Sequence, residues 1–224
     1  MSDQFFSKVA SLGTFLNSFV IFSSGIIFIA FVPQTENYKE FLRLLSYNMW
    51  GIQLFKTFGA VIGFLGIFTI VALYDFFKKE SKTWSLVVLI FGIFWAFSQI
   101  THGLWDTLRF PLLSAGGLSS SESVRSAAII ELNNPSPVDP NGIGTFVFLS
   151  FWIFVLALLA ISTKRLSQTI AYVSLFTAFF LIILFAGQTL LPKIIWQGLF
   201  LFYLLFIGPL FWLLLGIALS LKRD

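Results

Sequence analysis

Five side chains are spaced along one stretch of the sequence so that they share a face of a helix. Trp95, Gln99, His102, Asp106 and Arg109 follow one another at steps of four, three, four and three residues. Residues three or four apart are neighbours on an α-helix. A hydrogen bond between His102 and Asp106 and an ion pair between Asp106 and Arg109 are therefore feasible. His102 and Asp106 are the candidates for a catalytic acid–base pair.

Other polar residues lie at the ends of apolar stretches, on the same predicted side of a membrane. Gln53 and Lys56 open one stretch, Gln188 closes another, and Lys193 and Gln197 open the last. Polar groups in a bilayer are costly and often mark functional sites. Together with the first five they form the predicted ligand-binding set. The simpler interpretation is that they reach lipid headgroups, or cap or pack helices, with His102 bonded to Asp106 or to a backbone carbonyl.

The opposite halves of the apolar stretches are almost purely Phe, Leu, Ile and Val. Asn17 and scattered serines and threonines are the exceptions. A channel or carrier path needs polar groups through both leaflets. The sequence therefore predicts a plugged bundle with a polar vestibule in the outer leaflet.

Residue counts exclude several chemistries. The chain has no cysteine and one histidine, His102, which excludes c-type haem attachment, iron–sulfur clusters, bis-histidine haem and histidine-rich zinc sites. No Walker loop, dinucleotide fingerprint or GxSxG elbow is present, so no nucleotide motif and no metal site are predicted. A single axial bond from His102 to a haem or chlorin stays open, and the cofactor is otherwise unknown.

Composition places the chain in a membrane. Of 224 residues 58% are hydrophobic and 11% charged, and mean hydropathy is +0.92, against about 25% charged residues in a soluble domain. A nucleic-acid partner is excluded on the same ground. Six stretches reach the roughly 20 residues that a spanning helix needs, so we predict an all-α integral membrane protein, a six-helix bundle forming one domain over residues 1–224. The spans are 11–32, 53–76, 84–108, 143–162, 169–190 and 194–221.

Lysine and arginine predict the orientation. The larger share of the 14 basic residues lies in the short segments that share a side with the two termini, so both termini are predicted cytoplasmic. The expected location is the bacterial inner membrane, with the bilayer as partner. A short interfacial helix is predicted near residues 37–48, and a long outer loop at 109–142 with a short helix near 121–132 and a turn-rich lead at 133–142.

Small residues and one proline suggest packing features. Gly59 and Gly63 form a GxxxG pattern, which lets helices approach closely, either within the chain or across a homodimer. Pro209 lies inside the last span and predicts a kink.

Three segments carry a resemblance to a known family. They are NGIG at residues 141–144, KRLS at 164–167 and GPLFWLLLGIAL at 208–219. With six helices and a long third loop, the chain resembles the bacterial membrane family called domain of unknown function 4386. That family has no assigned activity, so the resemblance implies a fold and no catalytic residue.

Four functions stay open. The sequence lacks a complete catalytic set and therefore favours a non-enzymatic protein, either a small membrane subunit or a binder of a lipid, quinone or pigment. An intramembrane enzyme would use His102 and Asp106 on a lipid-like substrate. A haem or pigment subunit of an electron-transfer or light-harvesting complex would use His102 as a ligand, and a small transporter would need a path through the apolar half.

Overall fold

The computed structural model describes residues 3–32, 38–133, 139 and 142–221, and every regular element in these ranges is a helix. The first half contains α1 (Asp3–Phe31), α2 (Tyr38–Tyr47), α3 (Met49–Phe77), α4 (Lys82–Gly117) and α5 (Glu122–Asn133). The second half contains the π-helix η2 (Ile143–Phe148), α6 (Leu149–Thr163), α7 (Gln168–Leu190), α8 (Lys193–Phe202), the π-helix η3 (Tyr203–Ile207) and α9 (Gly208–Leu221).

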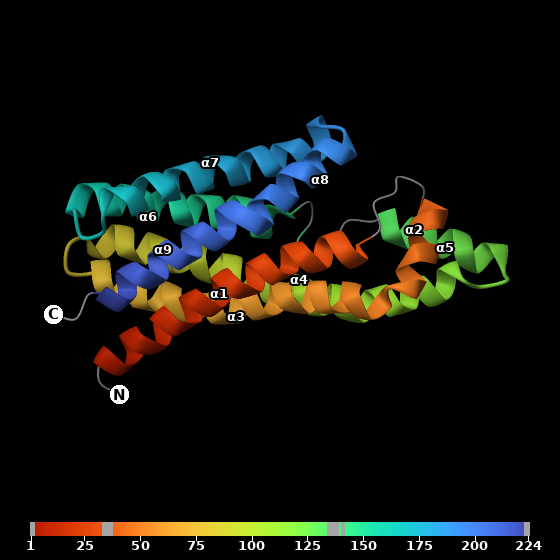
Figure 1. Ribbon diagram of the computed structural model, residues 1–224, viewed down its shortest axis with the longest axis horizontal. Helices are drawn as coiled ribbons and strands as arrows, with labels where there is room; N and C mark the ends of the chain where they lie inside the picture. Colours follow the sequence, from red (N-terminus) through yellow and green to blue (C-terminus); the bar gives the residue numbers. More distant parts are fainter. Residues whose placement is uncertain (1–2, 33–37, 134–138, 140–141, 222–224) are drawn as a thin grey trace.

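Six helices are long and apolar enough to cross a membrane, as the sequence predicts. They are α1, α3, α4, η2 with α6, α7, and α8 with η3 and α9. These helices lie roughly along one direction, with the start of α1 and the end of α9 at the same end of the bundle (Figure 1). The short helices α2 and α5 lie at the opposite end, and α5 confirms the helix predicted near residues 121–132.

The third spanning helix is longer than the predicted span, which stops at residue 108. α4 continues through Pro111 to Gly117. Proline has no N–H, so the carbonyl of Thr107, four residues earlier, loses its partner within the helix. The Gln53 side chain of α3 supplies a replacement, because its Nε2 donates to the Thr107 carbonyl at 3.3 Å. A contact from a neighbouring helix thus allows α4 to continue.

Pro209 is accommodated in a different way. The last spanning helix runs on through the Gly208–Pro209 step, and the five residues before it, Tyr203–Ile207, form η3. A π-helical turn changes the hydrogen-bond pairing just where proline removes a donor. Most of the predicted turn-rich lead at 133–142 lies outside the described residues.

The glycines of the GxxxG pattern face α4 of the same chain. A Cβ on Gly63 would lie 2.6 Å from the carbonyl oxygen of Ala96. On the other side, a Cβ on Gly103 would lie 2.6 Å from the backbone nitrogen of Ala60. Glycine at these positions lets α3 and α4 pack along their length. Association into a homodimer stays a prediction.

Three fully buried tryptophans form the centre of the core. Trp95, Trp152 and Trp212 come from α4, α6 and α9, and their ring centroids lie 5.6–5.7 Å apart. The Trp95 and Trp152 rings are parallel within 4°. The three helices therefore meet around one aromatic stack, and two of its members, Trp95 and Trp212, also line the cavity described next.

Candidate functional site

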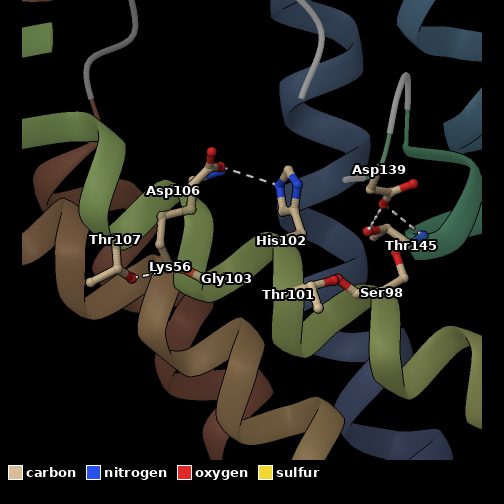
Figure 2. A network of polar contacts seen from close by, with 9 residues as sticks. All are labelled: Lys56, Ser98, Thr101, His102, Gly103, Asp106, Thr107, Asp139 and Thr145. Carbon is tan, nitrogen blue, oxygen red and sulfur yellow. Dashed lines mark hydrogen bonds and ion pairs between the residues drawn. The ribbon is translucent and has the colours of Figure 1, made fainter. Parts of the chain in front are cut away.

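One carboxylate joins the polar residues of α3 and α4. Asp106 Oδ2 lies 2.6 Å from Lys56 Nζ and 3.2 Å from His102 Nε2, and Asp106 is only 4% exposed. The predicted contact between His102 and Asp106 is confirmed, and Lys56 joins it from the neighbouring helix (Figure 2). A buried carboxylate needs such partners, since an unpaired charge would be strongly disfavoured.

Close helix packing puts Lys56 in reach of Asp106. A Cβ on Gly103 would lie 2.6 Å from the Lys56 carbonyl oxygen, so the two backbones touch one turn from the ion pair. The Thr57 and Thr107 hydroxyls lie 3.3 Å apart across the same interface, and Lys56 Nζ lies 5.4 Å from the centre of the Phe110 ring. These contacts fix the lysine side chain between α3 and α4.

A second carboxylate, which the sequence analysis did not single out, lies beyond His102 on the side away from Asp106 (Figure 2). Asp139 Oδ1 accepts from Gly144 N at 2.6 Å, and Oδ2 accepts from Thr145 N at 2.9 Å and Thr145 Oγ1 at 2.6 Å. The carboxylate therefore caps the start of the fourth spanning helix, where exposed N–H groups attract negative charge. An aspartate shortly before an apolar stretch was the available signal.

These groups surround a chamber of about 400 Å³ inside the bundle. Its polar lining includes Lys56, Gln99, His102, Asp139 and Gln188. The remainder is mostly apolar and aromatic, with these aromatic side chains: Phe28, Phe41, Phe55, Trp95, Phe110, Phe146, Trp196, Phe200, Tyr203 and Trp212. Both π-helices contribute to the wall, η2 through Thr145 and Phe146 and η3 through Tyr203 and Leu204.

The chamber stops near the middle of the bundle. On α4 its lining residues run from Phe110 to Trp95, and on α1 they run from Phe28 to Ile21. One turn further along α1, Asn17 is fully buried, and neither atom of its amide has a hydrogen-bond partner among the described residues. Thr14 and Thr69 follow, with their hydroxyls 2.8 Å apart. The half of the bundle that holds the start of α1 and the end of α9 is therefore packed protein with a few buried polar groups.

The structure brings part of the predicted ligand-binding set together. Lys56, Trp95, Gln99, His102 and Gln188 all line the chamber. Asp106 lies directly behind Lys56 and His102, where it holds both.

Four other members of the set have different positions. Gln53 donates a hydrogen bond to the Thr107 carbonyl, and Arg109 Nε lies 3.3 Å from Glu131 Oε1 of α5. Lys193 and Gln197 of α8 are not among the residues that line the chamber.

Potential metal ligands are sparse. In the part of the chain that the structure describes, no group of three or more His, Asp or Glu side chains could hold a metal ion. His102 is the single imidazole, and its Nε2 contacts Asp106. The chemistry that the site offers is therefore hydrogen bonding, charge pairing and proton exchange beside an aromatic wall.

The fold and the chamber define a class of protein, a helical membrane protein of six spans with an internal cavity. The family model described as "Domain of unknown function (DUF4386)" matches residues 13–216, so the chain belongs to that family. The match covers far more than the C-terminal segments on which the resemblance was based. No curated protein and no solved structure gives a significant match.

Proposed function

We propose that this protein binds a lipophilic small molecule in the chamber. The supporting observation is a cavity of about 400 Å³ whose walls are mostly aromatic and aliphatic, with a few polar side chains among them. Ligand pockets in proteins are typically about 300–1,000 Å³, mostly apolar, with a few polar groups that orient the ligand. The apolar part of the ligand contacts the aromatic wall, and its polar part lies near Lys56, His102 and Asp139.

Exposed aromatic residues support a position for the bilayer. Trp84 and Trp105 of α4 are 53% and 42% exposed, and the helical rise places them about 31 Å apart along the axis. This separation matches a hydrocarbon core of about 30 Å, whose boundaries favour tryptophan. Trp95 then lies near the bilayer centre and His102 near one boundary. The chamber therefore occupies one leaflet.

Charge supports the orientation. The connection between α3 and α4 carries Lys78 and Lys79, and Lys82 begins α4. By the positive-inside rule this side is cytoplasmic, so the chamber occupies the outer leaflet of a bacterial inner membrane. At that surface α2 buries Leu42 and Leu45 against the protein, while Tyr47 at its end is 73% exposed and Trp50, at the start of α3, is 60% exposed. The helix therefore lies in the interface with aromatic side chains toward the lipid headgroups.

The π-helices favour a functional cavity over an accidental void. π-helical turns are rare and are frequently found at functional sites. In the described residues both π-helices, η2 and η3, line this chamber. Backbone irregularity of this kind re-aims side chains, here Phe146 and Tyr203, which both line the cavity.

One observation favours a second candidate, acid–base chemistry on the bound molecule. The Asp106 carboxylate orients the His102 imidazole through Nε2 at 3.2 Å, while His102 Nδ1 has no hydrogen-bond partner among the described residues. A carboxylate that fixes an imidazole is the arrangement of a general base. This candidate predicts turnover of a lipid-like substrate that stops in a His102→Ala variant.

A cavity-filling variant tests the binding function. Gly59 lines the chamber, and a Cβ there would meet only Gln99 Oε1 at 3.7 Å, so Gly59→Phe would fill the space. Gly198 on α8 is exposed, and a Cβ there would meet nothing within 4 Å, so Gly198→Phe is the matched control. We expect a small molecule to co-purify with wild type and Gly198→Phe in native lipid discs and to be lost from Gly59→Phe.

Mass spectrometry and a visible spectrum of these preparations provide the readout. Equal occupancy in Gly59→Phe and Gly198→Phe would contradict the binding site. A Soret or chlorin band that disappears in His102→Ala would instead identify the occupant as a pigment or haem. Proton- or ion-coupled uptake into liposomes would revive the transporter alternative.

A further inference from the structure

The charges around the chamber do not cancel. The positive charge of Lys56 is paired with Asp106 at 2.6 Å, and that of Arg109 with Glu131 at 3.3 Å. Asp139 lines the chamber, is 4% exposed, and accepts hydrogen bonds from the neutral donors of Gly144 and Thr145. No ion pair forms at Asp139 in the described part of the chain. With His102 counted as a neutral imidazole, the wall therefore carries one negative charge, on Asp139, that no cationic side chain of the described residues pairs with.

The Asp139 carboxylate keeps capacity for a ligand. An ionised carboxylate has about four acceptor positions, and three donor groups use it here. Its three hydrogen bonds hold it rigidly at the start of the fourth spanning helix, so it loses little conformational freedom when a ligand binds.

An aromatic cluster lines the same chamber and begins on the helix that Asp139 caps. Phe146 directly follows Thr145, one of the residues that donate to Asp139. The centroid of its ring lies 6.2 Å from that of Phe200. Phe200 in turn stacks on Trp196 at 5.2 Å and meets Phe28 at 5.6 Å. The Trp196 indole is fixed because its Nε1 donates to the Leu184 carbonyl at 2.9 Å. All four rings line the cavity.

We propose that the chamber takes a lipophilic organic cation, with an ammonium head beside Asp139 and the rings of Phe146, Phe200 and Trp196. Aromatic faces carry a negative quadrupole that attracts quaternary ammonium groups, most strongly where water is excluded. Anionic heads are disfavoured because Lys56 is already neutralised by Asp106. This inference rests on the proposed binding function and specifies the charge of the ligand.

Three probes with the same tail separate charge from hydrophobicity. They are decyltrimethylammonium, decyl sulfate and the neutral decyl glucoside, titrated calorimetrically into the full-length protein in phosphatidylcholine discs, with empty discs subtracted. We expect one saturable site that binds the ammonium at least tenfold tighter than the sulfate. Tighter or equal binding of decyl sulfate would overturn the cation inference and leave the binding function intact. Absence of binding for all three probes, with no co-purified molecule, would refute both.

Two variants test whether the ammonium head group binds beside Asp139 in the chamber. Asp139→Asn keeps the side-chain shape and removes the charge, so the tenfold preference for the ammonium should disappear. Asp75→Asn is the control, because Asp75 is an exposed carboxylate paired with Lys78 outside the chamber. Unchanged preference in Asp139→Asn would overturn the placement.

Phe200→Leu covers the case in which Asp139→Asn disrupts the helix cap and fails to fold. It removes a ring and leaves every hydrogen bond of the carboxylate in place. The ammonium should bind at least threefold more weakly, while the neutral glucoside keeps its affinity. Parallel losses for both probes would show that the ring contributes only hydrophobic contact, and the cation inference would fail.

Discussion

The contact between α3 and α4 at Gly103 permits a quantitative test of the packing. A Cβ at this position would lie 2.6 Å from both the Ala60 nitrogen and the Lys56 oxygen, which are backbone atoms. Neither can rotate away, so Gly103→Ala must separate the helices. Overpacking of this kind costs about 1–3 kcal/mol, and alanine recovers up to about 1 kcal/mol of helix propensity over glycine. With the full propensity gain of about 1 kcal/mol, the net loss in the free energy of unfolding is up to about 2 kcal/mol.

Gly198→Ala is the matched control, because the same substitution on α8 would meet nothing within 4 Å. It should leave stability unchanged or raise it by up to about 1 kcal/mol. Unfolding by sodium dodecyl sulfate in mixed micelles, followed by far-UV circular dichroism, measures both variants against wild type. If Gly103→Ala proved as stable as Gly198→Ala, the close approach of α3 and α4 would not determine the position of Lys56.

Three further predictions concern buried groups and orientation. Lys56→Met leaves the Asp106 carboxylate buried without its cation, so the same unfolding assay should show a loss of about 3 kcal/mol, largely restored by adding Asp106→Leu; wild-type stability of the single variant would contradict the pair. Asn17→Leu removes a buried amide without partners among the described residues and should stabilise the protein by about 1–3 kcal/mol, whereas a loss would reveal a partner. Because the chain has no native cysteine, an impermeant maleimide applied to intact cells should label Ser121→Cys and spare Lys79→Cys, and labelling of both would refute the orientation.

The features of this fold that could be predicted from the sequence are those set by residue spacing within a single helix. The contact of His102 with Asp106 depends only on a four-residue step along one helix, so spacing was sufficient to predict it. The six spans follow in the same way from continuous apolar stretches of sufficient length.

Contacts between helices could not be predicted, because residue spacing along one helix does not determine which other helix packs against it. Glu131 beside Arg109 and Asp139 beside the fourth span both depend on how the long outer connection folds back, and no spacing rule encodes that. The continuation of α4 past Pro111 needs Gln53 from another helix. Lys193 and Gln197 open the last span from the predicted side, but the rotation of α8 leaves both out of the chamber lining.

The bond from Gln53 to Thr107 makes the stiffness of one helix depend on a side chain of another. Beyond Pro111, the last turns of α4 hold α2 and α5, with Leu113 buried beside Leu42, Leu45 and Ala128. Gln53 lies one turn before Lys56 on α3, so any sliding of α3 that breaks its amide bond also disturbs the lysine. Loss of this hydrogen bond would let the end of α4 tilt relative to α3 together with α2 and α5, which pack against it. The position of the two short helices is therefore coupled to the Lys56–Asp106 ion pair.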